Sequence, residues 1–287
     1  MWKSSYNLLG DILKKIFETI GFISLVCFSF FYTNEITSVI KENDDLLKQI
    51  TEVANEYEID SIDAKIIDDS IIPGVSGSSI NIDKSYDKMK KIDKFNSNLI
   101  VYENIKPNIS VLNKYDKYII SGNEKKNEVS LVLLNNEDIA KVLKILDKYD
   151  VKADFFVDLN WINNNDKLVK ELINNNHIIG SINSSSNDIN YINTIVSKIN
   201  KQKYTFCYNE EKNKEFLNNC KLNTSYTIIP SIKAFDNPLI NIKSNIKNGS
   251  IISLKINEKT INELPLIIEY IKSKGYDIVT LSKIIEE

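Results

Sequence analysis

The stretch Val129-Ser130-Leu131-Val132-Leu133-Leu134 has the composition of a buried strand, and the segment from Asp138 to Tyr149 that follows it has the apolar spacing of an amphipathic helix. The same unit recurs towards the end of the chain. Further strands are expected at residues 153–157, 177–182, 204–208, 224–229, 251–254 and 277–280, and further helices at 166–172, 189–199 and 264–274. Short apolar strands that alternate with helices are typical of a parallel sheet covered on both faces. So many units within about 160 residues favour a compact α/β barrel over an open sheet.

Four sequence segments of this region follow one another in a recognisable order. They are Val151-Lys152-Ala153-Asp154-Phe155-Phe156-Val157, then Lys167–Glu171 with Asn176–Gly180, then Gly249–Leu254, and finally Leu264–Ile268 with Lys274–Leu281. In the order and the amino-acid sequence of these segments, the chain from about residue 129 to 285 resembles the polysaccharide deacetylase (NodB-homology) domain. The resemblance implies an incomplete (β/α) barrel. It also implies the removal of N- or O-acetyl groups from glycans with the help of a divalent metal.

The resemblance indicates which positions would carry that chemistry. Family members usually hold the metal with one Asp and two His, while a second Asp acts as base, an Arg orients it and a late His acts as acid. In this chain the paired carboxylates fall on Leu134 and Asn135 (or on Asn135 and Asn136 after a one-residue slip), the two histidines on Ile182 and Ser186, the arginine on Cys207 or a neighbour, and the late histidine on Lys255. We therefore expect no catalytic residue, no metal site and no cofactor.

Composition supports this expectation in any alignment register. The 36 basic residues are all lysine, and His177 is the single histidine. Bidentate guanidinium clamps and metal sites with two imidazoles are therefore excluded. His177 matches the family's non-ligand histidine, which favours a structural role; a mixed site with Asp or Glu is the alternative, although no such cluster is visible. The formal net charge of −3 gives no reason to expect nucleic-acid binding.

Six polar residues are candidates for a binding role, because they end or follow predicted strands on the face where barrel active sites sit. They are Asn135, Asn136, Asp158, Asn183, Ser186 and Lys255. Asparagine and serine side chains can hydrogen-bond sugar hydroxyls, and Lys255 can attract an anionic wall polymer by its charge. The competing interpretation is a solvated lysine, with an asparagine content close to the background of this Asn-rich chain.

The N-terminal region predicts a membrane anchor. Residues 16–32 are mostly apolar, although the unbroken part, 20–32, is short for a span that usually needs about 20 residues. Lysines precede the run and acidic residues follow it, which predicts a single-pass protein of the cell membrane whose larger part faces outwards. A signal-peptide core and a buried amphipathic helix are the alternatives. The expected organisation is a cytoplasmic tail at 1–15, the anchor at 16–32, a stalk and lead-in region at 33–125, and the deacetylase-like domain at 126–287.

The lead-in region shows weaker patterns. A helix is expected over 44–57 and a shorter one over 86–91, with strands at 99–102 and 118–120 and a turn-rich stretch, Pro73-Gly74-Val75-Ser76-Gly77. Cys207 and Cys220 are read as lying at opposite ends of an intervening helix, about 15 Å apart by helix rise. That distance is too long for a disulfide, so two buried free thiols are expected.

Three functions are compatible with these observations. The preferred one is a non-catalytic, membrane-anchored, extracytoplasmic protein that binds cell-wall glycan or a wall-assembly partner through the old active-site face. The second is an active deacetylase with a rebuilt site, in which Asp158, Glu137 and Asp138 converge on one pocket. The third is a membrane scaffold whose working part is the anchor and the 33–125 region.

Overall fold

The computed structural model describes residues 19–29, 44–134, 138–199 and 202–287. Their contacts divide the chain into two compact units. The first comprises the described residues up to Ile59 together with Ser78–Asn104, and the second comprises Asp60–Gly77 with Ile105–Glu287. The predicted boundary between 125 and 126 does not coincide with this division, because two segments of the predicted lead-in region belong to the second unit.

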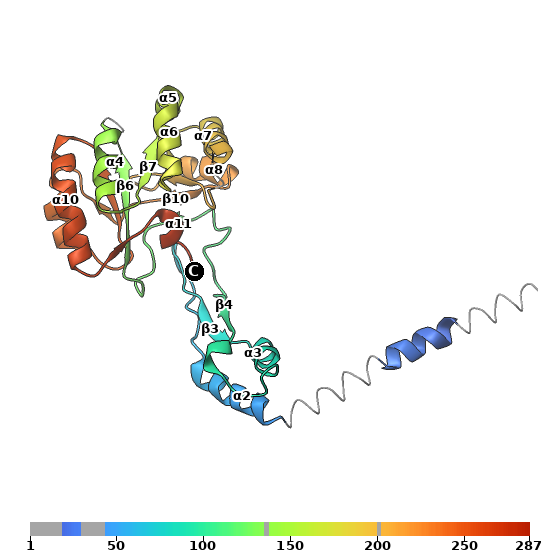
Figure 1. The fold of residues 1–287 in the computed structure, drawn as a ribbon. Coiled ribbons are helices and arrows are strands. Elements are labelled where there is room, and N and C mark those ends of the chain that lie inside the picture. The colour runs from blue at the N-terminus through green and yellow to red at the C-terminus, as the bar shows by residue number, and fades with distance from the viewer. Residues whose placement is uncertain (1–18, 30–43, 135–137, 200–201) are drawn as a thin grey trace, which may run out of the picture. The chain divides into compact units, whose positions relative to one another are not determined.

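One large sheet organises the second unit (Figure 1). Its strands run in the order β1 (Lys65–Ile67), β2 (Ser70–Ile72), β5 (Tyr118–Ile119), β10 (Tyr226–Ile228), β9 (Phe206–Tyr208), β8 (Ile178–Ile182), β7 (Asp154–Val157), β6 (Glu128–Leu134), β12 (Ile251–Lys255) and β11 (Ile232–Lys233), with β13 (Asp277–Ile278) beside the start of β6. All neighbours are parallel except β1 and β2. Strands β2 and β5 come from the predicted lead-in region, so this region completes the sheet.

Helices follow the strands and cover the outer face of the sheet (Figure 1). They are α4 (Ile139–Lys148), α5 (Leu159–Asn164), α6 (Asp166–Asn174), α7 (Ser186–Ile199), α8 (Lys214–Leu222), α9 (Pro238–Asn245) and α10 (Glu258–Ser273). The short α11 (Leu281–Ile284) instead packs Leu281 and Ile284 into the inner core. Successive side chains of β6 alternate between two cores: Leu131 and Leu133 contribute to the outer one, and Val132 and Leu134 to the inner one. Burial on both faces explains why these strands read as continuous apolar runs.

The sheet curls into a half-barrel. Strands β9 and β12 are separated in the sheet by β8, β7 and β6. Nevertheless the hydroxyl groups of Tyr208 on β9 and Ser253 on β12 share a hydrogen bond of 2.9 Å. Neighbouring strands lie about 4.8 Å apart, so this bond forms only because the sheet bends round on itself. An incomplete (β/α) barrel was expected, and the strands and helices predicted after residue 127 are present, whereas β11, α5, α9 and α11 were not predicted.

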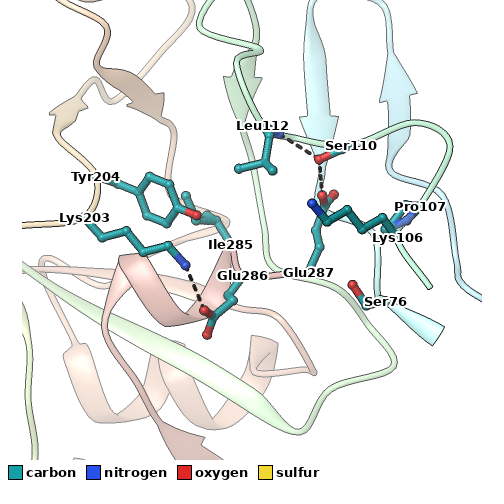
Figure 2. Close-up of a pocket in the computed structure, with 10 residues that line it drawn as sticks. All are labelled: Ser76, Lys106, Pro107, Ser110, Leu112, Lys203, Tyr204, Ile285, Glu286 and Glu287. Carbon is teal, nitrogen blue, oxygen red and sulfur yellow. Dashed lines mark hydrogen bonds and ion pairs between the residues drawn. The ribbon is translucent and has the colours of Figure 1, made fainter. Parts of the chain in front are cut away.

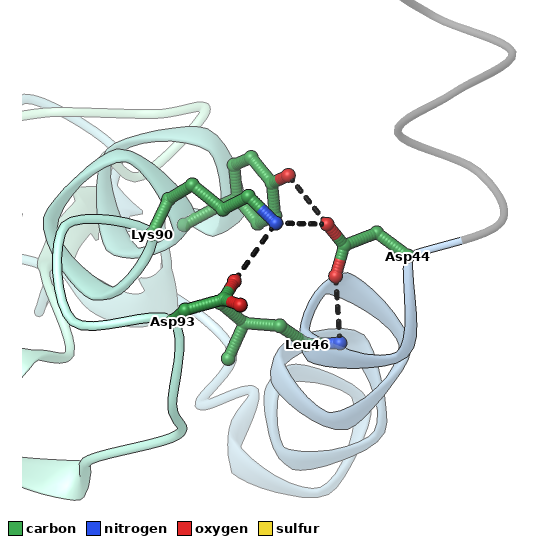
Figure 3. Close-up of polar contacts among 5 residues, drawn as sticks. Asp44, Leu46, Lys90 and Asp93 are labelled. Carbon is green, nitrogen blue, oxygen red and sulfur yellow. Dashed lines mark hydrogen bonds and ion pairs between the residues drawn. The ribbon is translucent and has the colours of Figure 1, made fainter.

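The first unit has a small core of its own. It contains α2 (Asp45–Tyr57), α3 (Ile82–Met89), the 3₁₀ turn Ser97–Leu99 and most of a two-stranded sheet formed by β3 (Gly77–Ile80) and β4 (Tyr102–Ile105). Asp44 caps α2: its carboxylate accepts hydrogen bonds from Leu46 N–H, the Tyr86 hydroxyl and Lys90 Nζ (Figure 3). These interactions hold the pKa of Asp44 at about 2, chiefly through the bond from Lys90.

Part of the predicted anchor lies outside the described residues. Residues 19–29 are helical, and their large apolar side chains are exposed. Within the described ranges, none of the helices combines the length and apolar character that a membrane crossing needs. The anchor at 16–32 therefore stays a prediction.

The expectation of two free thiols is wrong. Cys207 lies on β9 and Cys220 on α8, and the two form a disulfide with their Cα atoms 6.2 Å apart. They do not lie at the two ends of one helix, because α8 begins only at Lys214 and residues 209–213 connect it to β9. The bridge and Ile189 form a small buried cluster, and the partly buried Phe216 packs against it.

Candidate functional site

The predicted binding residues are distributed along the edge at which the parallel strands end. Lys255 ends β12, Asp158 follows β7, and Asn183 follows β8. These strands are close together in the sheet order, so their carboxyl ends meet at the mouth of the half-barrel. Asn135 and Asn136 follow β6 but lie outside the described residues.

Two of these residues are engaged in helix capping and packing. The carboxylate of Asp158 accepts a hydrogen bond of 2.7 Å from Trp161 N–H and caps α5. Ser186 begins α7, and both its carbonyl and its hydroxyl oxygen accept hydrogen bonds of 3.0 Å from the Asn223 amide. Asn183 is exposed and adopts a left-handed backbone conformation with φ of 50°, which asparagine tolerates better than most residues. Local structure thus accounts for the residue types at these positions.

Lys255 is the cation at the mouth, and it has two neighbours that the sequence did not indicate. Its Nζ lies 4.2 Å from the centre of the Phe235 ring and 3.7 Å from a carboxylate oxygen of Glu210. Glu210 follows β9, and Phe235 follows β11. Only the curl of the sheet brings these three residues together, so no sequence motif joins them.

Below the mouth, the inner face is filled by apolar and hydroxyl side chains. Leu134 is buried, as are Tyr208 and Ser253, and the rings of Phe156 and Tyr208 lie 5.4 Å apart. Burial raises the pKa of Tyr208 above its ordinary value, so the phenol stays neutral. At the position where the resemblance implies an arginine, Cys207 points into the outer disulfide cluster and Tyr208 is the inward-facing neighbour.

The buried ionisable groups lie at the other end of the strands. Asp154 begins β7 and is fully buried; its carboxylate accepts hydrogen bonds from the Ser130 hydroxyl (2.6 Å) and Leu281 N–H (2.9 Å). Burial raises its pKa to about 7. His177 immediately precedes β8 and accepts a hydrogen bond from Ala153 N–H through Nδ1. Burial lowers its pKa to about 4, so the imidazole is neutral at pH 7, which agrees with the structural role expected for it.

The carboxylates proposed for a rebuilt catalytic site are not gathered together. Asp158 caps α5, Asp138 forms an ion pair of 3.0 Å with Lys141, and Glu137 lies outside the described residues. Across the part of the chain that the structure describes, no three His, Cys, Asp or Glu side chains are close enough to hold a metal ion. Among the described residues, the charged groups at the mouth include the Lys255 ammonium and the carboxylates of Asp158 and Glu210.

Comparison with known proteins agrees with this architecture. Residues 128–228 match the sequence model of the polysaccharide deacetylase family. The chain carries a polysaccharide deacetylase domain. The match begins at β6 and ends at β10, so it covers the strands that contribute Asp158, Asn183 and Tyr208 to the mouth.

Relatives extend the similarity beyond the deacetylase domain. The chain is 28% identical over 280 residues to the uncharacterized protein YlxY of Bacillus subtilis, covering 88% of this chain and 87% of that protein. It also resembles the structure of BA3943 from Bacillus anthracis, described as a CE4 family pseudoenzyme, with a TM-score of 0.63 and 22% identity over 85% of this chain and 96% of that one. The structure of the Bc1960 peptidoglycan N-acetylglucosamine deacetylase matches 58% of this chain and 92% of that chain, with a TM-score of 0.53 and 23% identity. At these identities the solved structures show the shared fold.

Proposed function

We propose that the protein is a non-catalytic deacetylase-type protein that binds cell-wall glycan, or a partner in wall assembly, through the mouth of the half-barrel. One observation carries the proposal: the inward-facing positions at and below the mouth are Leu134, Tyr208, Ser253 and Lys255. Metal-assisted deacetylation needs carboxylates and imidazoles there, to hold the metal and to move protons.

The side chains present suit binding better than hydrolysis. Lys255 offers a positive charge at the mouth, and Phe235 offers an aromatic surface directly beneath it. Binding sites commonly combine an apolar surface with a few placed polar groups. Two structural neighbours support the two halves of the proposal by their descriptions: one is a pseudoenzyme, and the other is a peptidoglycan deacetylase.

Two features support a location outside the cytoplasm at the membrane. The Cys207–Cys220 bridge lies within the deacetylase domain, and disulfides persist mainly in oxidising compartments. The apolar stretch at 16–32, with lysines before it and acidic residues after it, fits a single-pass anchor that places the domain on the outer side. A fusion of a topology reporter to the C-terminus tests this orientation: activity only of a reporter that works outside the cytoplasm is expected.

The decisive experiment for the function is calorimetric titration of the full-length protein, in detergent micelles, with zinc and then with peptidoglycan fragments and chitin oligomers. We expect saturable glycan binding, no stoichiometric zinc binding, and no release of acetate. Lys255→Met keeps the apolar stem but removes the charge, and it is expected to weaken glycan binding. Lys170→Met, an exposed lysine on α6, is the matched control. Zinc-dependent acetate release would refute the non-catalytic assignment.

The same titration separates glycan binding from a scaffold role. If neither glycan binds, and a variant lacking the deacetylase domain still recruits its partners in cells, the working part of the protein is the anchor with the first unit. Loss of recruitment on deletion of the domain would instead favour a protein partner at the mouth.

A further inference from the structure

The side chain of Glu287 is held in a cradle of hydrogen-bond donors. One carboxylate oxygen, Oε1, accepts hydrogen bonds from Gly74 N–H (2.8 Å) and Val111 N–H (2.9 Å). The other oxygen, Oε2, accepts a hydrogen bond from the Ser110 hydroxyl (Figure 2). The three donors come from two segments of the second unit that are distant from each other in the sequence. Charge-assisted hydrogen bonds of this kind are roughly twice as strong as neutral ones.

The surrounding backbone fixes these donors independently of Glu287. Ile62 and Val75 exchange two backbone hydrogen bonds of 2.8 Å, which places Gly74 beside that bridge. A Cβ atom at Gly74 would lie only 2.3 Å from the carbonyl oxygen of Ile62, so glycine alone allows this approach. The Ser110 hydroxyl oxygen accepts a hydrogen bond from Leu112 N–H, which directs its own proton towards the carboxylate. The cradle is therefore preorganised for an anion.

A pocket of about 230 Å³ adjoins the cradle (Figure 2). It is lined by Ser110 and Glu287 of the cradle together with Ser76, Lys106, Pro107, Leu112, Lys203, Tyr204, Ile285 and Glu286. Lys203 and Tyr204 precede β9, so the pocket lies at the opposite end of the strands from the mouth. Of the three donors that hold the Glu287 carboxylate, only Ser110 lines this pocket. Its walls are largely apolar, Lys106 adds a positive charge, and Lys203 is paired with the Glu286 carboxylate at 2.9 Å. The apolar walls and the charge of Lys106 suit a small organic anion.

We propose that the cradle and its pocket form a binding site for the free carboxylate of a short peptide, and that Glu287 occupies this site from within the same chain. Capture of a terminal carboxylate by backbone N–H groups is a recurrent mode of peptide recognition. The pocket is slightly smaller than a site for a drug-sized molecule, and it has room for one or two small residues next to the carboxylate. This site is independent of glycan binding at the mouth.

The intramolecular contact lowers the apparent affinity for any ligand. A tethered group competes at an effective concentration on the order of millimolar. Removal of the Glu287 carboxylate is therefore expected to increase the affinity for a carboxylate ligand at least tenfold.

The experiment compares the full-length protein with its Glu287→Ala and Glu287→Gln variants. The probe is N-acetyl-alanyl-alanine with a free carboxylate, and the same peptide capped as an amide is the matched control ligand; binding is measured by calorimetry. We expect Glu287→Ala to bind the free acid at least tenfold more tightly than the unmodified protein, and to bind the amide weakly or not at all. Glu287→Gln keeps an acceptor oxygen for Gly74 and Val111, so it preserves the fold if the alanine variant is unstable. A smaller gain in affinity for the free acid is expected for this variant.

Two further variants test whether the cradle itself is responsible. Glu171→Ala removes an exposed carboxylate on α6 that does not line the pocket, and it should leave the affinity within about threefold of the unmodified protein. Adding Ser110→Ala to Glu287→Ala should reverse the gain. The proposal is overturned if folded Glu287→Ala and Glu287→Gln bind the free acid no better than the unmodified protein, or if acid and amide bind equally well.

Discussion

Replacing Asp154 with asparagine is expected to remove a pH-dependent loss of stability from the deacetylase domain. The carboxylate is fully buried between the Ser130 hydroxyl and Leu281 N–H, and burial raises its pKa from the ordinary 3.8 to about 7. Below pH 4 the carboxyl group is neutral in both the folded and the unfolded protein. Between pH 4 and 7 only the unfolded chain ionises, so the free energy of unfolding falls as the pH rises.

The magnitude follows from the difference between the two pKa values. At about 1.4 kcal/mol per pKa unit, the change from 3.8 to about 7 amounts to about 4 kcal/mol of stability lost by pH 7. His177 acts in the opposite direction, because its pKa falls from 6.5 to about 4 on burial. As the pH falls from 6.5 to 4, this imidazole becomes protonated in the unfolded chain but stays neutral in the folded protein. The free energy of unfolding therefore falls by about 3 kcal/mol. The contributions of Asp154 and His177 to the pH dependence of the free energy of unfolding therefore nearly cancel between pH 4 and 6.5.

Urea unfolding of the unmodified protein and of Asp154→Asn, followed by circular dichroism between pH 4 and 8.5, measures this effect. Asparagine has the shape of the neutral acid and can donate to Ser130 while it accepts from Leu281. The stability difference between the two proteins should change by about 4 kcal/mol in favour of the variant as the pH rises from 4 to 7. Asp158→Asn is the control, because asparagine caps a helix as well as aspartate does. A difference that stays constant within about 1 kcal/mol over this range would refute the assignment of a buried, titrating Asp154.

Three other predictions concern the same domain. Cys207→Ser should lower the free energy of unfolding by about 3 kcal/mol, the typical effect of a bridge that closes a loop of this length. A reducing agent should destabilise the unmodified protein but not this variant. Cys27→Ser is the control, and it should respond to the reducing agent as the unmodified protein does. Gly180→Ala should destabilise the domain by about 1–3 kcal/mol or more, because the new Cβ would lie 2.4 Å from the Phe156 ring; a midpoint of denaturation equal to that of the unmodified protein would contradict this packing. Addition of zinc or of a chelator should leave the melting temperature unchanged, and a rise with zinc would indicate a metal site.

Much of the half-barrel was predictable, because the signals for its elements are local. Strand β6 is apolar along its whole length since both of its faces are covered, and α4 has the spacing of a helix with one buried side. The short helices α5 and α9 were missed because their asparagine-rich sequences resemble loops. In the structure Asp158 caps α5, and Pro238 occupies the first turn of α9. Both are starting signals for a helix that are weak without a longer periodic segment behind them.

The candidate site was predictable only in its chemistry. The mouth can hold no pair of imidazoles and no guanidinium, whatever the fold, because the chain has one histidine and no arginine. The arrangement of Lys255 with Glu210 and Phe235 was not predictable, since it depends on the curl of the sheet. Asp158 follows β7 and Ser186 begins α7, and their hydrogen bonds engage them in capping and helix packing.

The sequence by itself determined most strands and helices of the half-barrel, the resemblance to the deacetylase family, and the absence of arginine and of a second histidine. These properties follow from residue types and from their local spacing. Only the tertiary structure decided that Cys207 meets Cys220, that β2 and β5 join the main sheet, and that Glu287 meets Gly74, 213 positions away. Such contacts depend on where the chain reverses and on how far the sheet bends, and neither is encoded in the period of a single segment.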